Sequence, residues 1–192
     1  MRPDTQKHLN KLTKITRAYI EATDEANEKL EQLKADFNNK RITSSVWTEK
    51  AEAIRENLNI KKVEAIEEIK ALKKLYADEI QEWETPRGED IDHEDVGLLS
   101  GIVTLTEKEI KALGQKHKDN PLMQRVLREY AEKQGYHYPT DQPGERMKKA
   151  FEAIAKAAGH AIESPSGYSG YQFRNEKHVE TLINTYSEDL GL

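Results

Sequence analysis

The stretch that decides the fold is residues 7–37, KHLNKLTKITRAYIEATDEANEKLEQLKADF. Its apolar residues recur at steps of three or four from Leu9 to Phe37, which is the spacing of one helix face and lies close to the coiled-coil repeat. No proline or glycine occurs between Asp4 and Trp83. The pattern therefore predicts one long helix of about 45 Å, at roughly 1.5 Å per residue.

A second stripe with the same spacing begins after the polar stretch 38–45 and predicts a helix over residues 45–84 of about 60 Å. A short connection between two long helices makes them antiparallel neighbours, so residues 1–85 are predicted to form a helical hairpin. The predicted seam consists of Leu9, Leu12, Ile15, Tyr19, Ala26, Leu30, Leu33, Phe37, Trp47, Ile54, Leu58, Ile69, Leu72, Tyr76 and Trp83.

The two apolar stripes have two interpretations. In the simpler one they pack only on each other, and in the second one the hairpin also associates with further copies of itself. Two helices alone bury little surface, and small cores are marginal. Besides the two tryptophans, the candidates for such a second contact are Tyr19, Val63, Ile66 and Tyr76. The sequence leaves open whether the hairpin closes within one chain or between chains, since domain swapping exchanges the two readily.

The composition excludes several classes of protein. Charged residues make up 34% of the 192 residues and hydrophobic residues 36%, with a net charge of −5, so elongated helices suit the chain better than a large compact core. The charges are mixed, which disfavours direct nucleic-acid binding. The absence of cysteine excludes disulfides and cysteine-based zinc sites. No signal peptide and no membrane-spanning apolar run are visible, so we expect a cytoplasmic protein.

Residues 86–94 are predicted to be a linker, because proline and glycine in Thr85–Asp90 interrupt the helical pattern. Residues 95–192 then read as a small helical module, which gives an all-α fold. Thr106 and Glu109 form a capping box, and Asn120 followed by Pro121 starts another helix. Further helices are predicted over 143–158 and 175–188, separated by a Gly/Ser/Tyr loop at 160–174.

Two segments are candidates for binding. The acidic cluster at residues 89–95, EDIDHED, offers oxygen ligands and one histidine, but it lacks the spacing of a calcium loop and reads as a solvated linker leading into a helix. The loop at 160–174 combines tyrosine with serine and glycine, a composition that suits binding surfaces. We expect its aromatic residues to contact a protein partner, and they are Tyr168, Tyr171 and Phe173.

No motif for chemistry is present. The chain has no phosphate-binding loop, dinucleotide fingerprint or nucleophile elbow, and its six histidines include no pair at metal-binding helical spacing. We therefore predict no catalytic residue, no metal and no cofactor, and expect a protein that is not an enzyme.

A resemblance adds to these patterns. The stretch SGIVTLT at 100–106, with Ile110 and Leu113, then KHKDNPLM at 116–123 and EYAEK at 129–133, resembles small proteins encoded near the capsid genes of tailed phages of Gram-positive hosts. It covers about residues 95–135. The resemblance implies a virion assembly role of the scaffold, capsid-associated or connector type, with a capsid protein and further copies of the chain as partners.

A second resemblance lies at the predicted turn. FNNKRIT at 37–43, followed by Trp47, Lys50 and Ile54, is similar to a short helical-hairpin motif at the ends of many oligomeric bacterial and phage proteins. That motif usually has glycine where this chain has Lys40 or Arg41. Both resemblances imply assembly. The alternative is a coiled-coil module or regulator that sequesters a host or bacterial protein, and an accessory subunit of an enzyme is a third reading.

Overall fold

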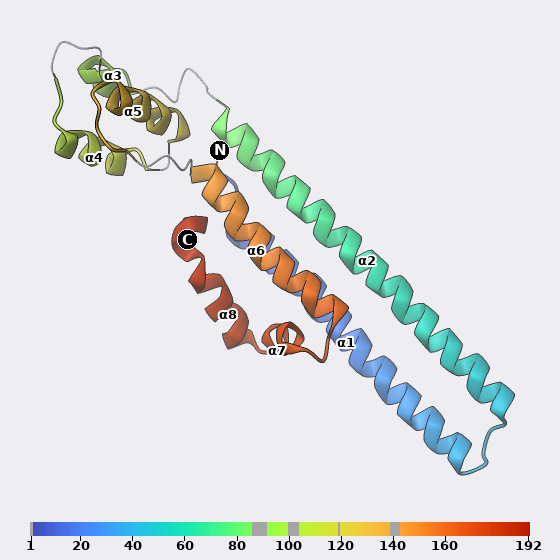
Figure 1. Cartoon of the computed structure of the whole chain (residues 1–192). Coiled ribbons are helices and arrows are strands. Elements are labelled where there is room, and N and C mark those ends of the chain that lie inside the picture. The colour runs from blue at the N-terminus through green and yellow to red at the C-terminus, as the bar shows by residue number, and fades with distance from the viewer. Residues whose placement is uncertain (1, 86–91, 100–103, 119, 139–142) are drawn as a thin grey trace. The chain divides into compact units, whose positions relative to one another are not determined.

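The computed structural model describes residues 2–85, 92–99, 104–118, 120–138 and 143–192, and across these ranges the chain is helical and has no strand (Figure 1). The predicted all-α fold is therefore confirmed. The helices are α1 (Thr5–Asn38), α2 (Ser44–Glu84), α3 (His93–Leu99), α4 (Glu107–Lys116), α5 (Pro121–Lys133), α6 (Pro143–Glu163), α7 (Tyr168–Arg174), α8 (Glu176–Thr185) and α9 (Ser187–Leu190).

The turn between α1 and α2 is a Schellman motif, in which a left-handed residue ends the first helix. Lys40 has φ 58°, its N–H donates to the carbonyl of Phe37 at 2.9 Å, and the Arg41 N–H donates to the carbonyl of Asp36 at 2.9 Å. The side chains of Arg41 and Asp36 also pair at 3.2 Å. Lys40 is one of the two positions at which the hairpin motif usually has glycine, and its backbone adopts the conformation that favours glycine.

The chain divides into two compact units that are not continuous in sequence. One comprises the residues up to Thr5, Leu75–Ala150 and Glu188–Leu192, and the other comprises Gln6–Lys74 and Phe151–Ser187. This differs from the predicted division into 1–85, 86–94 and 95–192. Helices α1, α2 and α6 each contribute to both units, because their apolar stripes continue without a break across the division.

The first unit contains α3, α4 and α5 around a small core. Its buried residues are Leu105, Ile110, Leu127, Tyr130, Ala131 and Tyr138. The Tyr130 hydroxyl accepts a hydrogen bond from the Leu105 N–H at 3.1 Å. The predicted helix starts are present: Thr106 and Glu109 form the capping box, and the Asn120 side chain accepts from the Met123 N–H ahead of α5.

The ends of three long helices also belong to this unit. The Glu84 carboxylate accepts from the Gly144 N–H at 3.1 Å, which joins α2 to the start of α6. The hydroxyls of Thr5 and Tyr76 lie 3.1 Å apart in a hydrogen bond, joining α1 to α2. The Arg2 guanidinium lies over the Trp83 ring at 6.0 Å from its centroid.

The second unit contains most of the hairpin together with the end of α6, α7 and α8 (Figure 1). Here α1 has a buried face that the seam pattern does not predict. His8, Thr16, Ile20 and Thr23 are all buried, and the His8 ring meets the Phe151 ring of α6 edge-on at 6.3 Å. Thr16 and Thr23 hide their hydroxyls by donating to the carbonyls of Leu12 and Tyr19, so threonine serves as an apolar residue on this face.

Two predictions about the C-terminal helices are wrong. The helix predicted to stop at Gly159 continues to Glu163, because Ala158, Ala161 and Ile162 keep its buried face going. The predicted Gly/Ser/Tyr loop at 160–174 is non-helical only over 164–167, since Tyr168–Arg174 forms α7.

The described residues include two long helices, α1 and α2, that carry many charged side chains. None of the helices of the described residues is both long enough and apolar enough to cross a membrane.

Candidate functional site

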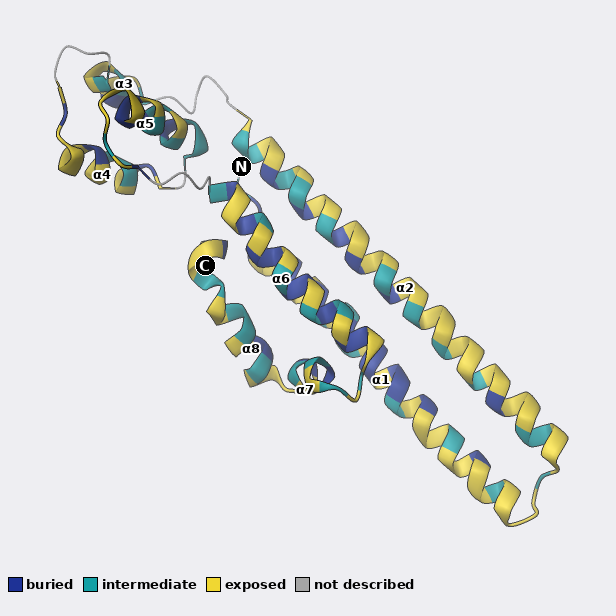
Figure 2. Ribbon diagram, viewed as in Figure 1, coloured by how far each residue is buried: buried dark blue, intermediate teal, exposed yellow. Residues whose placement is uncertain are grey.

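The part of the hairpin nearest the turn, residues 25–63, is called the arm below, and the rest of the same unit, residues 6–24, 64–74 and 151–187, is called the body. Burial of the seam differs sharply between them (Figure 2). In the body, Leu9, Leu12, Ile69 and Leu72 are at most 5% exposed. In the arm, Ala26, Leu33 and Ala51 are buried. The other large seam residues are only half-buried or exposed: Leu30, Phe37, Trp47, Ile54 and Leu58.

The remaining predicted seam residues include exceptions to this trend, since Ala26 of the arm is buried and Ile15 of the body is half-buried. Tyr19 and Ala26 are buried, and so is Tyr76 in the other unit. Ile15 and Trp83 are half-buried. Of the candidates for a second contact, Val63 is 53% exposed, while Ile66 lies in a groove between α2 and α6.

An aromatic pair stands beside the turn of the arm. The rings of Phe37 and Trp47 lie 6.0 Å apart at a tilt of 40°, and Phe37 remains 39% exposed. The Trp47 Nε1 is buried and has no hydrogen-bond partner among the described residues. A buried indole N–H normally finds a partner, so the pair is packed less completely than a core aromatic cluster.

A groove of about 330 Å³ runs between α1 and α2 in the arm and is called the arm groove. Its floor holds alanines and two half-buried seam residues, Ile54 and Leu58, and its rim is polar and charged. The full lining is Ala22, Glu25, Ala26, Lys29, Ala53, Ile54, Asn57, Leu58 and Lys61. Small floor residues allow another helix to approach closely, because interaxial distance depends on the side chains at the contact.

Helix α6 does not line the arm groove. Its residues line a separate groove together with Ile66, Ile69, Lys70 and Lys73 of α2, whereas the residues of the arm groove come from α1 and α2 alone. The seam is therefore not covered by α6 at this level of the arm.

The two halves of the arm, on either side of its turn, carry opposite net charge. Residues 25–38 hold four acidic and two basic side chains, for a net charge of −2. Residues 39–63 hold three acidic and six basic side chains, for a net charge of +3. Any surface that covers the arm must match both signs.

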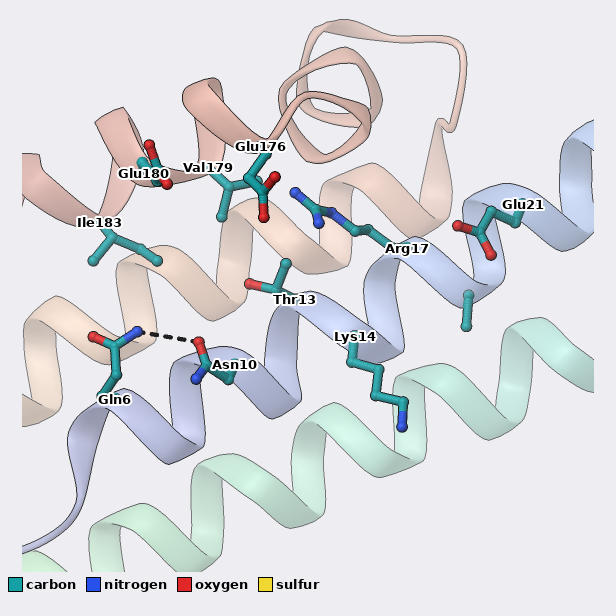
Figure 3. A pocket seen from close by; sticks show the side chains of 11 residues that line it. Gln6, Asn10, Thr13, Lys14, Arg17, Glu21, Glu176, Val179, Glu180 and Ile183 are labelled. Carbon is teal, nitrogen blue, oxygen red and sulfur yellow. Dashed lines mark hydrogen bonds between the residues drawn. The ribbon is translucent and has the colours of Figure 1, made fainter.

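A cavity of about 500 Å³ in the second unit lies between α1 and α8 (Figure 3). Lys14 and Arg17 stand on the α1 wall, while Glu176 and Glu180 stand on the α8 wall with Val179 beside them. The Arg17 Nε donates to the Phe173 carbonyl at 3.0 Å. The cavity is open and its walls carry both charges, so it resembles a solvated groove between two helices more than a site for a small ligand.

The predicted partner-binding aromatics fall on different sides of α7. Tyr168 is 78% exposed and Tyr171 58% exposed, and the Tyr171 ring lies 5.1 Å from that of His178. Phe173 is fully buried, so the prediction that it contacts a partner is wrong. The missing signal was helical spacing: residues 168 and 171 share one face of a helix, and residue 173 points inward.

The acidic cluster is built into the first unit. Asp95 is 6% exposed and is paired with Lys116 at 2.7 Å and, at close range, with the His117 ring. Asp92 accepts from the Asp95 N–H at 3.1 Å, and Glu89 and Asp90 lie outside the described residues. The solvated interpretation of Asp95 is therefore wrong, because α4 brings Lys116 and His117 to it.

The charges around Asp95 also set its protonation. Hydrogen bonds from Lys116 and His117 hold the pKa of the Asp95 carboxyl below its usual value, and the partner carboxylates raise the pKa of Lys116. Asp92, Asp95 and His117 have ligand atoms within 4.8 Å of one another, the composition of a cation site. The lysine ammonium already occupies a cation's place beside these carboxylates, so the cluster is balanced by the chain's own charges.

Comparison with protein-family models, with curated proteins and with solved structures gives no match for this chain, so its residues and their geometry carry the functional inference.

Proposed function

We propose that this chain is a non-enzymatic assembly protein that acts through protein–protein contacts, with the arm as its binding element. The single observation that carries the proposal is the half-exposed seam of the arm. Leu30, Ile54 and Leu58 occupy core positions of the hairpin but are not closed off from solvent. In the body seam, Leu9, Leu12, Ile69 and Leu72 are at most 5% exposed.

The incomplete burial of these arm residues favours the binding of a partner. A two-helix element buries little surface and gains little stability from it, whereas burying a large aliphatic side chain fully is worth about 1.5–3 kcal/mol. A partner that covers the arm therefore stabilises it and gains affinity from the same contact. Helix-in-groove recognition of this kind reads apolar residues at helical spacing.

The finer form of the proposal is a virion assembly protein of the scaffold, capsid-associated or connector type, present in the host cytoplasm or the virion. It rests on the resemblance of residues 95–135 to proteins encoded near phage capsid genes. The capped helices α4 and α5 and their buried core support it, since they make that segment a folded module able to present a surface.

The test is co-expression with the capsid protein of the same genome, with assembly products viewed by negative-stain electron microscopy. We expect the wild-type chain to change the yield or size of the particles, and the double variant Ile54→Lys/Leu58→Lys to lose this effect while it keeps its helical circular dichroism. The control is Asn59→Lys, at an exposed position outside the arm groove.

Two results would count against the proposal. If the wild-type chain leaves capsid assembly unchanged, the phage form fails. If the double variant acts like the wild type, the arm is not the binding element.

A second candidate is a module that sequesters a cellular protein, and the exposed tyrosines of α7 favour it. Tyr168 and Tyr171 present two amphipathic rings on one helix face, and such rings are enriched at binding surfaces. Tyr168→Ala/Tyr171→Ala should abolish partner binding under this reading and should leave capsid assembly unchanged under the first.

A further inference from the structure

We infer that the arm groove is the docking site for the arm of a second copy of this chain, with both turns pointing the same way and α1 of each copy against α2 of the other. The inference rests on the proposed function and names the partner of its binding element. It is carried by three observations within one compact unit: the half-buried floor of the groove, the absence of α6 from its lining, and the opposite net charges of the two helices of the arm.

The floor of the groove suits a helix rather than a small molecule. It is an open furrow with alanines at its base and Ile54 and Leu58 along it, and alanines permit close approach of a second helix pair. Two such furrows facing each other would bury the four half-exposed aliphatic residues as the core of a four-helix bundle.

The charges decide which copy-to-copy arrangement fits. With the turns pointing the same way, a two-fold axis along the arm places residues 25–38, of net charge −2, opposite residues 39–63 of the other copy, of net charge +3. If instead the turns point opposite ways, the two-fold axis crosses the arm and each helix faces the same helix of the other copy. Residues 25–38, of net charge −2, then face residues 25–38, and residues 39–63, of net charge +3, face residues 39–63. Like-charge pairing at an interface is costly, so the first arrangement is favoured.

This arrangement also satisfies the rules for a symmetric pair. The same groove is used on both copies, as a two-fold interface requires. Every helix of the four then has antiparallel neighbours of opposite charge. Helix α6 contributes no residue to the lining of the arm groove, so it leaves the floor of the groove accessible to the second copy.

The chain has no cysteine, so single cysteines report proximity without background. Lys29 and Asn57 line the same groove from α1 and α2. In the proposed pair, Lys29 of one copy stands on the wall that meets the Asn57 wall of the other copy. The experiment mixes a tagged full-length Lys29→Cys chain with an untagged Asn57→Cys chain and adds a short thiol-specific cross-linker.

Asn59→Cys is the matched control, because it replaces the same residue type at an exposed position about 200° further around the helix, at ~100° per residue. We expect the mixed Lys29→Cys and Asn57→Cys dimer to exceed the Asn59→Cys control by roughly tenfold or more, the gain expected when two thiols are held at high effective concentration. Light scattering of the wild-type chain should show a mass that rises from monomer to dimer with concentration.

Three results would overturn the inference. They are a strict monomer over the whole concentration range, equal cross-linking through Asn57→Cys and Asn59→Cys, and cross-linking of Asn57→Cys predominantly to itself, which indicates the opposite orientation. If any of these occurs while Ile54→Lys/Leu58→Lys still abolishes the effect on capsid assembly, the inference fails and the proposed function stands.

Discussion

The arm and the body are built from the same two helices and the same apolar spacing, yet they bury their seams to different degrees. In the body, α6, α7 and α8 give α1 a second buried face, and Leu12 and Thr16 become fully inaccessible. In the arm, helices α1 and α2 have only each other, and Ile54 and Leu58 stay half-exposed. The comparison shows that a seam pattern predicts which residues face a neighbour but not how many neighbours there are.

The most severe way to probe this contrast is to place a charge in each seam. Ile69 in the body is 5% exposed, and an unpaired charge there should lower the free energy of unfolding by about 3–5 kcal/mol. Leu30 in the arm is half-buried, so Leu30→Asp should cost only about 1–2 kcal/mol, since water still reaches the carboxylate. Urea unfolding of Ile69→Asp and Leu30→Asp measures both. Equal losses would show that the arm is as closed as the body.

Packing within the body can be probed at two glycines. A Cβ on Gly170 would lie 2.0 Å from the Pro165 carbonyl oxygen, whereas one on Gly159 would meet nothing within 4 Å. Gly170→Ala should therefore destabilise by about 1–3 kcal/mol through overpacking. Gly159→Ala, within α6, should stabilise by up to about 1 kcal/mol through helix propensity. Thermal unfolding of the two variants tests this, and a neutral Gly170→Ala would mean that α7 is free to move off the 164–167 segment.

The ion pairs around Asp95 lie in the first unit, outside the arm and the body. Their contribution to stability depends on pH. The pKa of Asp95 lies below its usual value in the folded chain, so its stabilisation is complete above the unfolded pKa of about 3.9 and disappears as the pH falls through the lower folded value. At neutral pH, Asp95→Asn should lower the free energy of unfolding by about 1–3 kcal/mol, because Lys116 and the buried His117 ring lose a hydrogen-bonded charge.

The measurement is urea unfolding of the wild type and of Asp95→Asn, each at pH 7 and pH 3. The difference between the two chains should shrink at pH 3. A difference that stays constant would show that Asp95 contributes by packing rather than by its charge.

The smallest expected effect is at the turn of the arm. Lys40 has a left-handed backbone, which costs a non-glycine residue about 1–2 kcal/mol. Lys40→Gly should recover up to about 1 kcal/mol of that cost, because glycine loses more chain entropy on folding. Asn39→Gly, one residue earlier and outside the left-handed region, should give no gain. A turn stabilised equally by both changes would contradict the Schellman geometry.

Much of the fold follows from the sequence for local reasons. The hairpin, its turn, the capping box at Thr106 and Glu109 and the start of α5 all depend on residues within a few positions of one another. The errors lie where distant segments meet. Asp95 reads as solvated because Lys116 and His117 are more than twenty residues away, and Thr16 reads as polar because nothing local announces that α1 has a second buried face.

The arm was only partly predictable for the same reason. Its seam residues follow from the spacing, and so do the two interpretations of a closed or a self-associating hairpin. The loss of burial between Leu33 and Leu58 depends on where α6 and α8 end, which the helical spacing of residues 1–85 does not contain. Gly159 reads as a helix terminator because the helix-propensity cost of glycine is local. The buried Ala161 and Ile162 after it continue the helix through tertiary packing.

The contacts of α1 also set an order of folding. The turn at Lys40 joins Phe37 to Trp47 across ten residues, whereas Arg17 meets the carbonyl of Phe173 across a sequence separation of 156. Short loops close early and long ones late, and chains are synthesised from the N-terminus. The local contacts of the arm can therefore form while the ribosome is still making α6, before the long-range contacts of the body are possible.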